Sequence, residues 1–170
     1  ASAYNNLLTN AGGVDLGDTD GALVLDYAGN ADPAAAVRSI LANNTGQIRS
    51  STMTAGHAIG YVDDATASKV SVRVTLLGDA NLDQSVDVAD LGELATSYGA
   101  TTGGTWAAGD FNYDNRVDVA DLGMLATNYG QTSIAATGAF IHADVTTVPE
   151  PAMLALFAVA AVLLGRDRRR

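Results

Sequence analysis

The sequence predicts an α+β fold: a β-rich N-terminal segment with one helix, a small α module of two loop-helix repeats, and a C-terminal hydrophobic helix. Three observations predict it. The first 76 residues contain short runs rich in Val and Leu, a 22-residue pattern occurs twice at an offset of 31, and an uncharged stretch of 14 residues precedes an Arg-rich end. We therefore divide the chain into a β-rich segment (1–76), the repeat module (77–131), a linker (132–148) and a C-terminal segment (149–170).

The N-terminal segment is predicted to place short strands around one helix. Strands are expected at 21–29 and 69–77, which are rich in Val and Leu with partial alternation, and a further strand is expected at 57–64. The helix is expected in DPAAAVRSILANN, because Asp32 is a capping residue, Pro33 suits a first turn and the run 43–46 ends the pattern. The acidic run 15–21 fits either a solvated turn or an incomplete calcium loop.

The acidity of the chain is concentrated in the repeats. The formal net charge is −10, and the span 79–121 alone carries eight Asp, one Glu and one Arg. This distribution argues against nucleic acid as a partner and favours a cation. Cysteine is absent, which rules out a disulfide framework and a thiolate metal site. Because the chain begins ASAY, we expect a mature form or the end of a longer protein.

The two repeats, GDANLDQSVDVADLGELATSYG (78–99) and GDFNYDNRVDVADLGMLATNYG (109–130), are identical at 16 of 22 positions. Calcium takes about six to eight oxygen ligands, and a twelve-residue loop supplies them from positions 1, 3, 5, 7, 9 and 12. These positions hold Asp79, Asn81, Asp83, Ser85, Asp87 and Asp90 in the first repeat, and Asp110, Asn112, Asp114, Arg116, Asp118 and Asp121 in the second. We predict two calcium ions, and the alternative is a pair of acidic surface turns.

Three loop positions carry further expectations. Position 7 contributes a main-chain carbonyl, so the Arg116 side chain is expected to point outward. Position 8 is Val86 or Val117, and we expect these β-branched residues to pair the loops edge to edge. Position 6 needs a positive φ, which Asn115 tolerates better than Gln84, so the first site is expected to be the weaker one.

Each loop is followed by apolar residues at helical spacing. We expect these residues to form core contacts between two short helices, with Trp106 from the connection in the same core. Without a metal, the like charges of each loop repel one another, so calcium is expected to stabilise the fold. The predicted helix contacts are Leu91, Leu94, Ala95 and Tyr98, and Leu122, Leu125, Ala126 and Tyr129.

Each repeat is predicted to have a helix after its loop and none before it. The two repeats share the sequence pattern GDxNxDxxVDVADLxxLATxYG. Over residues 78–130 this pattern resembles a type I dockerin module. The resemblance implies calcium binding and docking onto a cohesin domain through the tenth and eleventh loop positions. These are Val88 and Ala89, repeated as Val119 and Ala120, and the repetition would permit two binding orientations. The alternative is that these residues only begin the helices.

The C-terminal segment combines Pro149, Glu150 and Pro151, an uncharged stretch at 152–165 and an Arg-rich tail. The stretch is shorter than the roughly twenty residues that a helix needs to span a bilayer. By itself it would fit a tail anchor or a buried helix, and these remain the alternatives to the sorting signal described next. The arrangement resembles the PEP-CTERM sorting signal, which implies export to the cell envelope or beyond, transient membrane anchoring and processing by an exosortase-type enzyme. Together with the dockerin-like repeats, it resembles the C-terminal end of large secreted proteins from planctomycete-type bacteria, in which a β-rich repetitive region often precedes the dockerin.

The sequence therefore predicts a non-catalytic calcium-binding module of an exported protein, which attaches a partner or caps the structure. The alternative is the C-terminal part of a carbohydrate-active enzyme whose catalytic domain lies upstream. No catalytic residue is predicted, because neither His57 nor His142 is beside a nucleophile or metal motif, and the acidic pairs that glycoside hydrolysis would need are assigned to calcium.

Overall fold

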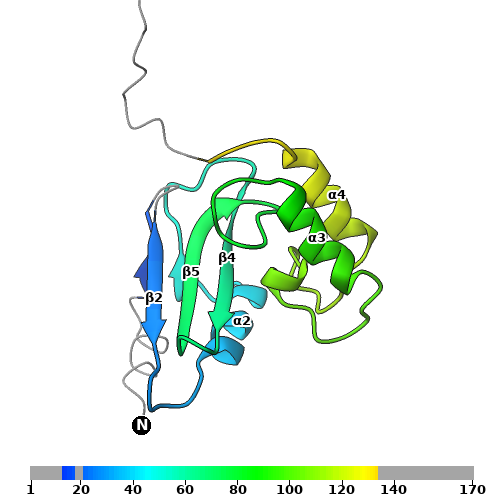
Figure 1. Ribbon diagram of the computed structural model, residues 1–170. Helices are drawn as coiled ribbons and strands as arrows, with labels where there is room; N and C mark the ends of the chain where they lie inside the picture. The colour runs from blue at the N-terminus through cyan, green and yellow to red at the C-terminus, as the bar shows by residue number, and fades with distance from the viewer. Residues whose placement is uncertain (1–12, 18–20, 134–170) are drawn as a thin grey trace, which may run out of the picture. The chain divides into compact units, whose positions relative to one another are not determined.

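The computed structural model describes residues 13–17 and 21–133, so the predicted sorting segment at 149–170 and His142 lie outside the described residues. Within them, a three-stranded sheet and helix α2 precede the two repeat helices (Figure 1). The elements are β1 (Val14–Asp15), β2 (Ala22–Asp26), α2 (Ala34–Ala42), β3 (Ile48–Arg49), β4 (His57–Asp64), β5 (Lys69–Leu76), α3 (Val88–Ser97), the 3₁₀ helix η1 (Trp106–Ala108) and α4 (Val119–Asn128).

Strand β5 is the centre of the main sheet, with β2 and β4 antiparallel on its two sides. Its Val70, Val72 and Val74 alternate with polar residues and are fully buried, as expected for a strand with one face against a core. The strands predicted around 21–29, 57–64 and 69–77 are confirmed. A second, two-stranded parallel sheet joins β1 to β3.

Helix α2 forms where the sequence predicts it. The Asp32 carboxylate accepts a hydrogen bond of 2.8 Å from the Ala34 amide, and Val37 and Ile40 are buried. The helix ends before Asn44, which adopts a φ of 46°. None of the helices in the described part of the chain is long and apolar enough to cross a membrane.

The repeat helices α3 and α4 each begin directly after the ninth loop residue. Asp87 and Asp118 are their N-caps, and each forms a reciprocal capping box with the Asp three residues later. Strand β5 precedes the first loop and η1 precedes the second, so each repeat has one α-helix. The two helices lie side by side (Figure 1).

The predicted pairing of the two loops through Val86 and Val117 is wrong. Val86 donates to the carbonyl of Gln131 at 3.0 Å and accepts from Gly130 at 2.8 Å. Val117 makes the equivalent bonds to residues 100 and 99, at 3.0 and 2.9 Å. Each loop therefore pairs with the segment that follows the helix of the other repeat, because that segment leaves its helix in an extended conformation with free backbone groups.

The predicted helix contacts are only half correct. Leu94 and Leu125 are buried, and Leu91 and Leu122 are partly buried against the core. Tyr98 and Tyr129 are about half exposed, at 52% and 51%, because each is a C-cap with extended backbone (ψ 131° and 130°) and leaves the helical register. Ala95 and Ala126 are also exposed, so the buried stripe of each helix is narrower than predicted.

One hydrophobic core contains side chains of both the sheet and the repeats. Trp106 is fully buried in it and contacts the ring of Phe111 edge-on at a centroid distance of 5.1 Å, as predicted for the connection. The glycine before each loop packs on the helix of the other repeat: a Cβ on Gly78 would lie 2.7 Å from Leu125 Cα, and one on Gly109 would lie 2.9 Å from Leu94 Cβ. This close approach accounts for Gly at the first position of both repeats.

Candidate metal centre

Residues 79–90 (loop 1) and 110–121 (loop 2) have the same backbone conformation. The sixth residue has positive φ in both, 73° at Gln84 and 75° at Asn115, as the sequence predicts. The fourth residue, Leu82 or Tyr113, also has positive φ, at 63° and 62°. This second strained position was not predicted, since neither residue type favours it.

The first aspartate of each loop is fully buried and organises the turn. Asp79 Oδ2 accepts a hydrogen bond from the Gln84 amide at 2.8 Å and another from the Thr75 hydroxyl, and Asp79 Oδ1 accepts from the Asp83 amide at 3.2 Å. Asp110 Oδ2 accepts from the Asn115 amide at 3.0 Å. In both loops the carboxylate thus lies inside the turn that the backbone makes around it.

The twelfth residue closes each loop from its other end. Asp90 is fully buried, with Oδ1 accepting from the Ala80 amide and Oδ2 from the Asp87 amide, both at 2.8 Å. Asp121 is also fully buried and accepts from the Phe111 and Asp118 amides, both at 2.9 Å. The first and last predicted ligands of each loop are therefore held in place by its own backbone.

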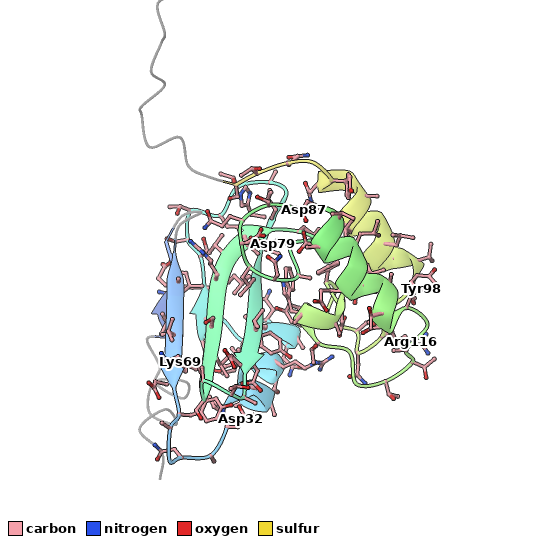
Figure 2. The ribbon with its side chains drawn as sticks, viewed as in Figure 1. Asp32, Lys69, Asp79, Asp87, Tyr98 and Arg116 are labelled. Carbon is pink, nitrogen blue, oxygen red and sulfur yellow. The ribbon has the colours of Figure 1, made fainter. Side chains whose placement is uncertain are left out.

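The predicted ligands between them lie nearer the solvent and accept local backbone hydrogen bonds. Asn81 Oδ1 accepts from Asp83 at 2.8 Å, Asp83 Oδ1 from Ser85 at 2.9 Å, and Asp87 Oδ1 from Ala89 at 2.7 Å. Loop 2 repeats these contacts through Asn112, Asp114 and Asp118. Figure 2 shows Asp79 and Asp87 at the same end of α3, with Tyr98 at the other end.

Within residues 13–17 and 21–133, no group of three or more His, Cys, Asp or Glu side chains is gathered closely enough to hold a metal. The intermediate ligands are turned toward backbone amides, so calcium would have to draw them inward. The seventh-position Arg116 is exposed, as its predicted carbonyl role requires.

One observation in loop 2 does fit a cation. Asp110 Oδ1 is buried without a hydrogen-bond partner among the described residues, while Oδ2 of the same carboxylate accepts from Arg38 and the Asn115 amide. An unpaired buried carboxylate oxygen is costly, and a metal ion is one of the few groups that compensates it. The predicted ligands of loop 2 would supply oxygen atoms only, which suits calcium or magnesium rather than zinc or copper.

Burial raises the pKa of both first-position aspartates. The pKa of Asp79 rises to about 6, against the opposing hydrogen bonds from Thr75 and the Gln84 amide. The pKa of Asp110 is also raised by burial, and here the Arg38 guanidinium is the largest opposing influence. The fold therefore holds these carboxylates in surroundings that disfavour an uncompensated negative charge.

Two arginines of the N-terminal segment reach the loops, and sequence analysis missed both. Arg38 of α2 forms an ion pair with Asp110, with Nη2 3.0 Å from Oδ2. Arg73 of β5 donates to the Leu82 carbonyl at 3.4 Å, and its Nη2 and Nε lie 2.7 and 2.8 Å from the Gln84 side-chain oxygen in the amide orientation that satisfies both groups. Neither contact has a local sequence signal, because each depends on tertiary packing.

The predicted partner residues lie at the exposed starts of the repeat helices. Val88 and Val119 are 69% and 70% exposed, and Ala89 and Ala120 are exposed as well. Val88 and Val119 are the first residues of α3 and α4, which agrees with the alternative that these residues only begin the helices. The start of a helix does not, however, require a large apolar side chain in solvent.

The other polar candidates have structural partners. His57 Nδ1 lies 3.0 Å from Thr54 Oγ1 and His57 Nε2 lies 2.8 Å from Ser133 Oγ, so the ring joins the start of β4 to the segment after α4. Asp15 Oδ1 accepts from the amides of Gly17 and Ser51, both at 3.0 Å, which matches the solvated-turn interpretation of this run. Residues 18–20 of the run lie outside the described residues.

Comparison with known proteins identifies the C-terminal segment. Residues 147–170 match the PEP-CTERM protein-sorting motif, and the match includes Pro149, Glu150 and Pro151. The predicted sorting signal is thereby confirmed, and it marks an exported protein that an exosortase-type enzyme processes. Neither a curated protein nor a solved structure was found to match the chain.

Proposed function

We propose that residues 77–131 are a non-catalytic, dockerin-like module that binds two calcium ions in this exported protein. The observation that carries the proposal is the buried, unpartnered Oδ1 of Asp110, which lies at the first ligand position of loop 2. Its counterpart in loop 1, Asp79, has the same burial and the same hydrogen bond to the sixth-residue amide. Each loop therefore places a fully buried carboxylate at its first ligand position, although both oxygens of Asp79 already accept hydrogen bonds within the protein.

Buried charge is the physical argument for the metal. Each loop buries two carboxylates completely, at its first and twelfth positions. Among the described residues, only one of these four, Asp110, takes part in an ion pair. Burying an ionised carboxylate without a counter-charge is unfavourable, so a divalent cation in each loop would stabilise the fold.

Calcium would be held by oxygens of the predicted positions in each loop. In loop 1 these are the side chains of Asp79, Asn81, Asp83, Asp87 and Asp90 with the Ser85 carbonyl, and in loop 2 those of Asp110, Asn112, Asp114, Asp118 and Asp121 with the Arg116 carbonyl. When bound, the ion would supply positive charge at the centre of the loop and replace repulsion between carboxylates with attraction to a common centre.

Calcium titration of the full chain tests the proposal. We expect two binding events by calorimetry, together with a fluorescence change of Trp106, whose indole donates to the Asp79 carbonyl and which is the only tryptophan in the sequence. Asp79→Ala and Asp110→Ala should each abolish one event, whereas Asp26→Ala, a substitution at the exposed end of β2, should abolish neither. Absence of heat and of any spectral change would refute calcium binding.

We further propose that the module attaches a partner, with a cohesin-type domain as the first candidate. The supporting observation is that Val88 and Val119 project into solvent at equivalent places, each followed by an exposed Ala. Structural capping is the competing role, and it is supported by the core that the module shares with the sheet. The two roles are compatible, because they use different residues of the repeats, exposed for attachment and buried for capping.

Binding assays with cohesin-type domains, in calcium and in EGTA, distinguish these roles. If the module attaches such a partner, retention should require calcium and be lost in the double variant Val88→Asp and Val119→Asp. The matched control is Thr96→Asp with Thr127→Asp, which changes exposed residues of the same helices at the same offset. Retention of binding in the valine variant would exclude this surface.

A further inference from the structure

Arg38 places a positive charge against the first ligand position of loop 2. Its Nη2 lies 3.0 Å from Asp110 Oδ2, and its Nε donates to the Gly104 carbonyl at 2.9 Å. The Asp110 side chain is completely buried and that of Arg38 is 23% exposed, so solvent screens the pair only weakly. The two anchoring contacts fix the guanidinium in place beside the loop.

In the part of the chain that the structure describes, no cation forms an equivalent ion pair with loop 1. The corresponding oxygen of Asp79 is bonded to a neutral hydroxyl, that of Thr75. Arg73 approaches loop 1, but it donates to the Leu82 carbonyl and to the Gln84 side-chain oxygen rather than to a carboxylate. Two loops of matching conformation therefore differ in the group that faces their first aspartate.

The two loops also differ in net charge. Loop 1 contains four Asp and no Lys or Arg, whereas loop 2 contains four Asp and Arg116. With the arginine that contacts each loop added, Arg38 for loop 2 and Arg73 for loop 1, the formal charge is −2 at loop 2 and −3 at loop 1. A divalent cation is therefore attracted less strongly to loop 2 and is repelled by the guanidinium next to Asp110.

We propose that Arg38 is a built-in counter-ion of loop 2 that weakens calcium binding there, so that calcium fills loop 1 first. This inference rests on the calcium-binding function proposed above. Arg38 compensates Asp110 when no metal is bound, yet it leaves Oδ1 of that carboxylate open to a cation. The order is the reverse of the one expected from Gln84 in the sequence, whose side chain is buried and bonded by Arg73.

Removing Arg38 should change stability and affinity in opposite directions. The metal-free protein should become less stable, because Asp110 would remain buried without its partner. Calcium affinity at loop 2 should rise by about tenfold or more, because the ion would then provide the only compensating charge. A contact that only supported the shape of loop 2 would instead lower both quantities.

Amide NMR spectra of the full chain during calcium titration follow the loops separately. The Gln84 and Asn115 amides each donate to the first aspartate of their loop, so their signals report loop 1 and loop 2. In the unmodified protein, the Gln84 signal should respond at lower calcium than the Asn115 signal. In Arg38→Met the Asn115 response should move to about tenfold lower calcium, and the metal-free melting temperature should fall.

Additional variants keep the test decisive. Arg38→Gln also removes the charge and should also increase the calcium affinity of loop 2, so it replaces Arg38→Met if that variant does not fold. Arg38→Lys retains the charge and should increase the calcium affinity much less. Arg49→Met, which removes a charge paired with Asp15, should leave both responses unchanged. The inference is wrong if the Asn115 signal responds before or together with the Gln84 signal in the unmodified protein. It is also wrong if Arg38→Met and Arg38→Gln leave the calcium midpoint of the Asn115 signal unchanged. If no signal responds to calcium in any variant, the proposed function fails and the inference fails with it.

Discussion

The indole Nε1 of Trp106 donates a hydrogen bond of 2.6 Å to the main-chain carbonyl of Asp79. This bond joins the connection between the repeats to the first residue of loop 1. The ring also packs against loop 2, with centroids 5.1 Å from Phe111 and 5.6 Å from Tyr113. One side chain therefore contacts the start of both candidate metal loops, which makes its environment sensitive to either of them.

Replacing this indole should destabilise the protein and disturb loop 1. Trp106→Phe leaves a cavity in the core and an unsatisfied carbonyl at Asp79, and we expect a loss of about 3 kcal/mol in the free energy of unfolding. Urea unfolding followed by circular dichroism measures this loss. Tyr98→Phe, at a half-exposed aromatic residue, is the control and should change stability by less than about 0.5 kcal/mol. Equal effects of the two changes would contradict the assigned role of Trp106.

The close packing of each repeat glycine on the opposite helix gives a second prediction. Gly109→Ala introduces a Cβ 2.9 Å from Leu94 Cβ at a residue with a φ of 98°, so we expect destabilisation by about 2–3 kcal/mol. Gly123→Ala is the matched change inside α4, where a Cβ meets nothing within 4 Å, and it should stabilise by up to about 1 kcal/mol. Thermal unfolding of both variants measures the contrast, and a neutral Gly109→Ala would mean that the repeats pack less closely.

The sequence predicted the local features of the candidate site better than its tertiary partners. The helix after each loop and the positive φ at Gln84 and Asn115 both follow from the residue order within a single repeat. Two tertiary contacts could not be predicted in this way. The backbone hydrogen bond between Val86 and Gly130 joins residues 44 positions apart, and the ion pair between Arg38 and Asp110 joins residues 72 positions apart. Such contacts depend on how the helices pack in the folded protein. The periodicity of apolar residues in the sequence predicts helices and strands but not their packing partners.

Protonation of Asp79 should make the metal-free protein more stable in acid. Burial raises its folded-state pKa to about 6 from the ordinary 3.8, so the folded state binds this proton more tightly than the unfolded state. The resulting stabilisation, up to about 3 kcal/mol, is fully present below pH 3.8 and is lost as the pH rises through about 6.

Denaturant unfolding in calcium-free buffer between pH 3.5 and 7, roughly spanning both pKa values, measures this dependence. Asp79→Asn removes the titrating group and should flatten the slope between them. Acidic groups such as Asp15, whose pKa is lowered by hydrogen bonds from Gly17 and Ser51, contribute a slope of opposite sign in both proteins and cancel in the comparison. Identical slopes with and without Asp79 would show that its carboxylate titrates normally.

The ninth loop residue combines two roles that substitution can separate. Asp87 caps α3 by accepting from the Ala89 amide at 2.7 Å, and it is also a predicted calcium ligand. Asp87→Ser keeps a capping oxygen but removes the charge, whereas Asp87→Ala removes both. In the absence of metal, Asp87→Ala should cost about 1 kcal/mol more than Asp87→Ser.

Calcium affinity should respond differently from stability. Both variants should weaken binding at loop 1 to a similar extent, because both lack the carboxylate, and the Gln84 amide signal should shift at higher calcium in each. The second loop, followed through Asn115, should retain its midpoint. If calcium binding stays unchanged while only the alanine variant is destabilised, Asp87 is a helix cap and not a ligand, and loop 1 would have to bind calcium through its other five positions.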